Sequence, residues 1–160
     1  MLSLSGLPIR VEIRRSLGPH SAATSIPGRL ILLDAGLLAT RGEFERILVH
    51  ELFHFAWVRL SNQTRREWEA VLAEELAAGV CGELGWSAEW RKAKLNESDP
   101  RTRTRRWRLY ACESFCDTAA WSYTGFYTGL AKHDEFTLPQ RARRRRQRWF
   151  QVRLADPLPV

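Results

Sequence analysis

The sequence predicts an α+β domain in which a small N-terminal sheet, antiparallel or mixed, is followed by a helical bundle. Three observations support this class. Two short segments near the N-terminus have strand character, several later segments have helical spacing, and the two kinds do not alternate along the chain. With 160 residues, 44% of them hydrophobic, the chain can bury a core. We expect one domain over residues 1–138 and a basic helix or tail over residues 139–160.

The two predicted strands both lie before the first helix. In residues 10–16, Val11 and Ile13 alternate with Glu12 and Arg14, as in a half-buried strand. A turn-rich stretch with two prolines and two glycines follows, and the apolar run RLILLD at residues 29–34 comes after it. Together these segments predict a small sheet.

The first helix is predicted to begin at a capping box formed by Thr40 and Glu43. It should extend to about Leu60, because apolar residues recur there at three- and four-residue spacing. These residues are Phe44, Ile47, Leu48, Leu52, Phe55 and Ala56. A second helix is expected from Thr64, a possible cap, to Gly82 or Gly85, and a short third helix over residues 87–95.

A longer helix is predicted over residues 105–125, with Gly125 as a plausible end. The residues expected on its inner face are Leu109, Cys112, Phe115, Cys116 and Ala119. The last segment, from about Pro139, is either a basic helix or a frayed tail. Strands first and helices afterwards is the order typical of segregated α+β domains.

The net charge of +7 is concentrated near the C-terminus. Residues 141–153 contain seven arginines and no acidic residue, so the rest of the chain is close to neutral. One interpretation is a phosphate-binding element formed by Arg143, Arg144, Arg145 and Arg146, beside aromatic residues 149 and 150 that could stack on bases. The other interpretation is a solvated basic tail.

The cysteine content and the apolar runs indicate a cytoplasmic protein without a membrane partner. No apolar stretch in the sequence is long enough to span a membrane, and we expect no N-terminal secretion signal, because no long apolar run follows a basic segment there. Three cysteines, Cys81, Cys112 and Cys116, are too few for a disulfide framework. Cys112 and Cys116 are spaced to bind a soft metal on one helix, although such a pair more often consists of small buried residues.

The motif HELFH at residues 50–54 indicates a zinc site on the first helix. His50 and His54 are four residues apart, so both imidazoles leave one face of a helix and can bind a single ion. Glu51 points about 100° away from His50, which suits a base that reaches the attacking water. The other interpretation is two polar residues in a core.

A catalytic zinc ion usually has three protein ligands, so a third ligand is required. Glu113 is the preferred candidate, and Asp117 lies one turn later on the same face of its helix. Asp117 could accept a hydrogen bond from the outer nitrogen of a zinc-binding histidine. His133, Glu74 and Glu75 remain alternatives for the third ligand.

HELFH on one helix and ESFCD on a later helix resemble the gluzincin branch of the zincin metallopeptidases. The resemblance covers roughly residues 10–125 and depends on these two short motifs, in a minimal form without large flanking domains. In that family a small sheet precedes the active-site helix and binds extended substrate along its edge strand, which would be residues 29–34 here. The asparagine that usually precedes the ligand glutamate is replaced by Cys112.

The resemblance implies a hydrolase with one Zn²⁺ per chain that cleaves peptide bonds in a peptide or protein substrate. His50, His54 and Glu113 would bind zinc, and Glu51 would act as general base. Gluzincins also use a tyrosine or a histidine to stabilise the oxyanion. Tyr123 is the preferred candidate for this role, with residues 110, 127 and 133 as alternatives. A purely structural zinc is a further possibility, and it would have a fourth protein ligand in place of water.

Overall fold

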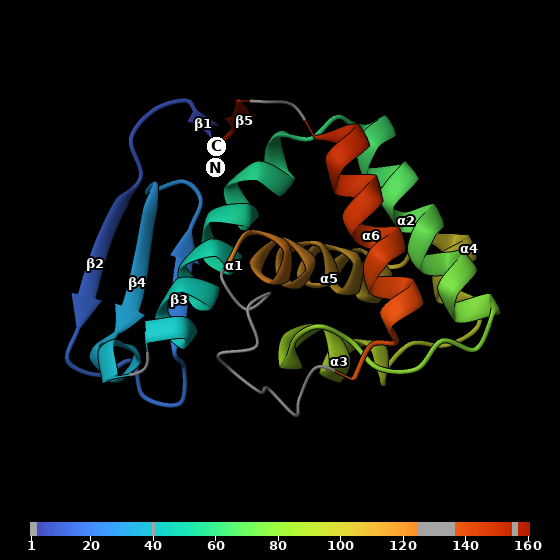
Figure 1. The fold of residues 1–160 in the computed structure, drawn as a ribbon, viewed down its shortest axis with the longest axis horizontal. Helices are drawn as coiled ribbons and strands as arrows, with labels where there is room; N and C mark the ends of the chain where they lie inside the picture. The colour runs from blue at the N-terminus through green and yellow to red at the C-terminus, as the bar shows by residue number, and fades with distance from the viewer. Residues whose placement is uncertain (1–2, 40, 125–136, 155–156) are drawn as a thin grey trace. The chain divides into compact units, whose positions relative to one another are not determined.

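The computed structural model describes residues 3–39, 41–124, 137–154 and 157–160. Its elements are, in order, β1 Leu4–Ser5, β2 Arg10–Arg14, β3 Ala22–Ser25, β4 Leu30–Asp34, a 3₁₀ helix Ala35–Ala39, α1 Arg41–Arg59, α2 Asn62–Ala77, α3 Trp86–Lys92, α4 Asp99–Thr102, α5 Arg105–Tyr123, α6 Gln140–Arg153 and β5 Leu158–Pro159. Small N-terminal sheets followed by a helical bundle confirm the predicted α+β class (Figure 1).

The chain forms two compact units. Unit 1 contains residues 1–59, 119–131 and 155–160, and unit 2 contains residues 60–118 and 132–154. Helix α5 therefore contributes its residues 105–118 to unit 2 and its residues 119–123 to unit 1. This division differs from the predicted boundary at residue 138, because the basic helix α6 belongs to the same unit as α2, α3 and α4.

Unit 1 contains a three-stranded mixed sheet with strand order β2-β4-β3 (Figure 1). The central strand β4 runs parallel to β2 and antiparallel to β3. Ile31 and Leu33 on β4 are fully buried. Both predicted strands are present, but Val11 and Ile13 on β2 are 44% and 50% exposed, so the face expected to be buried is open. The physical reason is that α1, which covers the sheet, packs mainly beside β3 and β4.

Strand β3 lies in the stretch that the sequence predicts as a turn. Its small residues Ala22–Ser25 have little strand preference of their own. They pair with β4 in a regular antiparallel register, from Ala22 opposite Leu33 to Ser25 opposite Leu30. Backbone pairing with β4 therefore decides this strand, and β3 is the second edge of the sheet.

A second, two-stranded sheet in unit 1 joins the chain ends. Strands β1 and β5 pair in parallel, with Leu4 opposite Leu158 and Ser5 opposite Pro159 (Figure 1). Gly6 follows β1 with a φ of +128°, and a Cβ there would lie 2.4 Å from the carbonyl oxygen of Val160. Only glycine fits this approach without a shift of the backbone.

Helix α1 packs beside β3 and β4 in unit 1. Of the predicted apolar face, Phe55 and Ala56 are fully buried, whereas the other four residues are half-buried. Phe53, which the spacing did not assign to that face, is also fully buried. The helix spans Arg41–Arg59, close to the predicted range. Thr40, the predicted cap, lies outside the described residues.

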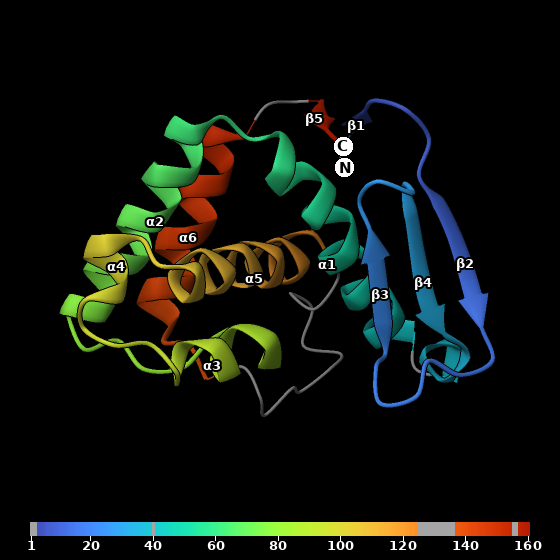
Figure 2. The ribbon, with the colours of Figure 1, turned by 180° about the vertical axis from the view of Figure 1, so that it is seen from behind.

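Unit 2 has an aromatic core to which α2, α5 and α6 each contribute. The rings of Trp68 and Phe150 have centroids 5.4 Å apart, and those of Phe115 and Phe150 are 4.9 Å apart. The indole N–H of Trp68 donates to the carbonyl oxygen of Ala111 at 3.0 Å. Helices α2 and α6 run side by side in both views (Figure 1, Figure 2). The basic segment is thus a packed helix and not a frayed tail.

Two helices of unit 2 differ from the prediction in detail. Helix α2 is capped by Ser61, whose hydroxyl accepts a hydrogen bond from the Thr64 N–H at 3.0 Å, so Thr64 is not itself the cap. The helix ends at Ala77, before Gly79 with its φ of +69° and before the predicted end. On α5, Leu109 is 44% exposed instead of facing inward. Among the described helices, none combines the length and the apolar composition that a bilayer span requires.

Candidate metal centre

Helix α1 places the HELFH motif as its spacing predicts. His50 and His54 are one turn apart, with ring centroids 5.0 Å apart and ring planes at 75° to each other. His50 is buried, and His54 is half-buried. Apolar residues of the same helix surround these polar rings in sequence, so burial without polar partners would carry a substantial free-energy cost. This pair is the part of the predicted zinc site that a single helix determines.

Glu51 is buried and hydrogen-bonded to the sheet of unit 1. The hydroxyl of Thr24 on β3 donates to Oε2 of Glu51 at 2.6 Å. The contact leaves the second carboxylate oxygen for another proton or donor and restricts the side-chain rotamer. Thr24 is a site residue absent from the sequence prediction, because the strand that positions it has no sequence signal.

The edge strand next to Glu51 is β3. The family resemblance implies an edge strand at residues 29–34, but β4 is the central strand, with neighbours on both sides. That assignment is wrong, because the extra strand β3 pairs with β4 and takes its place at the edge. Glu51 is bonded to this edge strand through Thr24.

Tyr123, the predicted oxyanion donor, lies in unit 1 at the end of α5. Its ring stacks on Phe53 of α1, with centroids 5.4 Å apart and planes within 26°. The side chain is 41% exposed. Tyr123 thus packs on Phe53, the residue that precedes His54 on α1. Its catalytic role stays a prediction.

The predicted zinc ligands are divided between the two units. His50 and His54 belong to unit 1, while Glu113 and Asp117 belong to unit 2. Within unit 2, Oε1 of Glu113 lies 3.1 Å from a guanidinium nitrogen of Arg91 on α3. Whether Glu113 completes the site stays a prediction, and Arg91 is a partner that the sequence did not reveal.

Asp117 supports the start of helix α3. Its Oδ2 accepts a hydrogen bond from the backbone N–H of Ala88 at 3.3 Å. Its carboxylate lies against Gly85, where a Cβ would come within 2.3 Å of the carboxyl carbon. A carboxylate from α5 thus caps α3, which begins at a glycine without a capping side chain of its own. Its predicted role toward a histidine stays a prediction.

The alternative ligands and donors have competing partners in unit 2 or lie outside the described residues. Glu74 is exposed and paired with Arg145, and Glu75 is buried and paired with Arg146 at 2.7 Å. Tyr110 is buried and donates its hydroxyl to Glu83, so it is not free to act as an oxyanion donor. Burial and the neighbouring Glu83 carboxylate raise the pKa of Tyr110 well above its ordinary value. Residues 127 and 133 lie outside the described residues.

None of the three cysteines forms a disulfide. Cys81 is exposed, Cys112 is half-buried and Cys116 is fully buried. Burial and the neighbouring Cys112 raise the pKa of the Cys116 thiol well above its ordinary value. In chemical terms, Cys116 is a further donor on α5, one turn after Glu113.

The four arginines of the predicted phosphate-binding element have different environments. Arg146 is fully buried, and its guanidinium bonds to Glu75 at 2.7 Å and to Glu83 at 2.6 Å. Its assignment to a nucleic-acid contact is wrong, because this helical position faces the core of unit 2. Arg143 is half-buried and donates to the carbonyl oxygen of Leu138.

Arg144 and Arg145 are the two exposed members of that element.

Burial by itself raises the pKa of the Glu83 carboxyl, but Arg146 and Lys92 lower it, and the net pKa lies below its ordinary value. The Glu83 carboxylate is therefore charged at neutral pH and balances the buried arginine.

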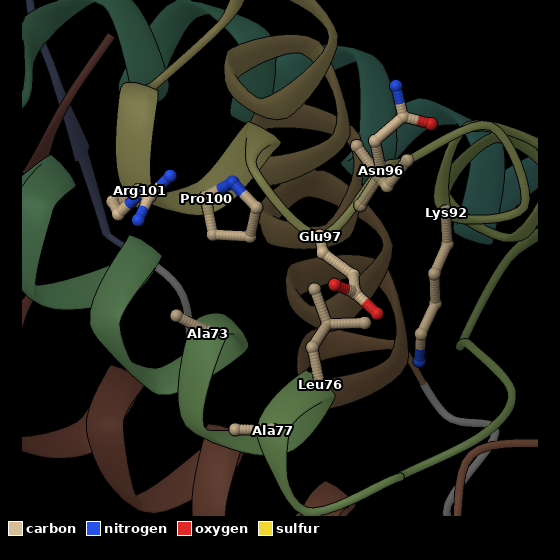
Figure 3. Close-up of a pocket in the computed structure, with 9 residues that line it drawn as sticks. Ala73, Leu76, Ala77, Lys92, Asn96, Glu97, Pro100 and Arg101 are labelled. Atoms are coloured by element: carbon tan, nitrogen blue, oxygen red, sulfur yellow. The ribbon is translucent and has the colours of Figure 1, made fainter.

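A cavity of about 690 Å³ lies in unit 2, between α2 and the segment that includes α3 and α4 (Figure 3). Its apolar lining includes Leu76, Leu95 and Pro100, and Lys92 lies at its margin. The Lys92 ammonium donates to two backbone carbonyl oxygens, those of Val80 and Gly82. None of the predicted site residues lines this cavity.

Comparison of the chain with protein-family models, with curated proteins and with solved structures gives no match. The chain's own residues therefore carry the function, above all the α1 motif and strand β3, which contacts it.

Proposed function

We propose that this chain is a zinc-dependent metallopeptidase in which His50 and His54 bind the metal and Glu51 is the general base. One observation carries the proposal: α1 places two imidazoles 5.0 Å apart and, beside them, a carboxylate hydrogen-bonded to an edge strand. Glu51 would thus lie between a zinc ion on the histidines and an extended peptide paired with the edge strand. The substrate class is a peptide or protein, and cysteines without disulfides suit the reducing cytoplasm.

The residues fit zinc by donor chemistry. Two imidazoles one turn apart on a helix supply two of the three protein ligands that a catalytic zinc requires. The third is Glu113 in our proposal. Cys116 is the competing donor, because with His50 and His54 it would give the two-histidine, one-thiolate set that zinc also accepts. Bound zinc would supply Lewis acidity toward a substrate carbonyl and toward water.

The chain's own residues would carry the proton transfers. Glu51 takes the proton of the attacking water at the carboxylate oxygen that Thr24 does not occupy, and later passes it to the leaving amine. The Thr24 hydroxyl keeps the Glu51 carboxylate beside β3. The free side of β3 would pair with an extended peptide, because backbone N–H and C=O groups of an edge strand can bind another strand. Tyr123 would donate a hydrogen bond to the oxyanion.

Zinc content is the first test. Elemental analysis of the purified wild type should give one zinc per chain, and His54→Ala should lose most of it. Glu89→Ala is the matched control, because Glu89 is an exposed acid on α3. A folded wild type that binds no zinc would refute the metallopeptidase.

The third ligand is tested by Glu113→Ala and Cys116→Ala side by side. Glu113→Ala should lose zinc while Cys116→Ala retains it. Cobalt substitution separates the two donors independently, because a thiolate ligand adds a strong near-ultraviolet absorption band and a carboxylate does not. A thiolate band that Cys116→Ala abolishes would transfer the ligand role from Glu113 to Cys116.

Catalysis is tested by Glu51→Gln on a peptide library. Loss of a general base typically lowers the rate by about 10²–10⁴. We expect zinc content to stay at one per chain while hydrolysis falls by this factor. Equal hydrolysis in wild type and variant would remove the catalytic proposal and leave a structural zinc.

A further inference from the structure

Helix α3 exposes a pair of tryptophans. Trp86 and Trp90 lie one turn apart and are 70% and 47% exposed. Their ring centroids are 6.2 Å apart and their planes are within 19° of parallel. Tryptophan side chains usually bury most of their area. Two nearly parallel indoles open to solvent offer flat apolar faces on which another planar ring can stack.

Two cations lie over the Trp90 ring. The Lys94 ammonium lies 3.2 Å from the centroid of the Trp90 ring, and the Arg91 guanidinium lies 5.6 Å from it. The surface therefore combines aromatic faces with cations. Its chemical complement is a molecule with planar rings and negative charges.

Helix α6 exposes a stripe of arginines in the same unit. Arg141, Arg144, Arg145 and Arg148 are spaced by three, one and three residues, which places them on one face, and all four are exposed. The opposite face carries the buried residues of the helix. Arg145 pairs with Glu74, while the other three form no ion pair with any residue that the structure describes. The stripe is about 10 Å long.

The helices that carry the aromatic pair and the arginine stripe begin next to each other in unit 2. The N–H of Leu138, just before α6, donates to the carbonyl oxygen of Glu83, just before α3, at 3.2 Å. Both views show the start of α6 beside α3 (Figure 1, Figure 2). Unit 2 contains 18 basic and 12 acidic residues, a net charge of +6 out of +7 for the whole chain.

We propose that unit 2 binds a single-stranded polynucleotide, with bases stacked on Trp86 and Trp90 and phosphates on the α6 stripe. A duplex keeps its bases stacked inside, so it cannot use the indoles. A single strand presents bases and phosphates together, and stacking accepts every base. The site differs from the one expected from sequence alone, because Arg141 and Arg148 belong to it and Arg146 does not. It is independent of zinc and of peptide hydrolysis.

The test is fluorescence anisotropy with labelled 12-nucleotide single strands of DNA and RNA of mixed sequence. About four phosphate contacts predict a slope near −3 for the logarithm of the binding constant against the logarithm of salt concentration. Trp90→Ala should weaken binding about 5- to 150-fold, because one stacked base contributes about 1–3 kcal/mol. The double variant Arg144→Gln/Arg148→Gln should reduce the salt slope by about 1.4.

Control variants separate the proposed site from the effects of net charge and of misfolding. Arg101→Gln/Arg105→Gln removes two exposed positive charges from other surfaces of unit 2 and should change affinity far less. All substituted residues are at least partly exposed, so circular dichroism should show an unchanged fold. Losses confined to the tryptophan and α6 variants would support the proposal.

Three outcomes would overturn it. One is no binding to either strand at 50 mM salt. A second is binding that the tryptophan variant leaves unchanged, because that would be nonspecific attraction to a basic protein. The third is binding to phosphatidylglycerol vesicles without binding to either oligonucleotide, which would assign the surface to a membrane.

Discussion

Helices α1 and α6 both bury charged or polar side chains, and they do so in chemically different ways. On α6, Arg146 meets the carboxylates of Glu75 and Glu83, which together compensate its charge inside unit 2. On α1, two imidazoles lie beside a carboxylate that receives a hydroxyl hydrogen bond. The first set is an ion-pair network that holds helices together. The second set contains the donor types that a metal and a proton transfer need.

A run of polar residues in a sequence does not define a function by itself. The arginine run divides into a buried Arg146, a half-buried Arg143 and an exposed stripe, because a helix turns successive residues by about 100°. The histidines remain together because four-residue spacing keeps them on one face. Each difference leads to a measurement.

The largest expected effect concerns the buried arginine. Arg146→Met would leave Glu75 and Glu83 buried without their main counter-charge, and breaking such a pair typically costs about 3–5 kcal/mol. Urea unfolding followed by circular dichroism should show this loss. Arg144→Met, on the exposed face, should change the free energy of unfolding by less than about 0.5 kcal/mol. Equal effects would show that α6 is not anchored by Arg146.

Acid should act on the same network. The pKa of Glu83 is lower in the folded state, so its stabilising contribution is present above the ordinary carboxyl pKa and is lost as pH falls through the folded value. The urea midpoint should therefore stay level from pH 7 to pH 5 and fall below about pH 4.5. Glu83→Gln should flatten this fall. An identical acid profile in wild type and variant would contradict the assignment.

An intermediate effect is expected at the strand that positions Glu51. Thr24→Val removes the hydroxyl that bonds the Glu51 carboxylate, and hydrogen bonds to charged groups contribute about 1.5–3 kcal/mol. We expect kcat to fall about 10- to 100-fold with zinc content unchanged, and Thr24→Ser to restore most of it. If Thr24→Val kept the activity and Thr24→Ser lost it, Thr24 would have a purely structural role.

The smallest expected effect is on the free energy of unfolding and concerns the N-cap of α2 in unit 2. Ser61→Ala removes the N-cap of α2 and should cost about 1 kcal/mol, whereas Thr64→Ala should keep the cap. Urea midpoints of the two variants make the comparison. A larger loss in Thr64→Ala would return the cap to the residue expected from sequence.

The predictable part of the fold is the part encoded by local periodicity. Strands β2 and β4, helix α1 and helix α5 follow from alternation or from three- and four-residue spacing. Strand β3 does not, since its small residues form a strand only when β4 is beside them. The pairing of β1 with β5 joins residues at opposite ends of the chain, which no local pattern encodes.

The sequence by itself determined the α+β class and the one-turn separation of His50 and His54, because both depend on contacts between residues close in the chain. Only the tertiary structure decided that Thr24 bonds Glu51, that β3 is the edge strand, and that Arg146 is enclosed by two carboxylates. For Glu51 and Arg146 the physical reason is distance along the chain, because their partners are 27 to 71 residues away and only packing brings them together. Strand β3 is close to β4 in sequence, but its small residues have no strand pattern of their own.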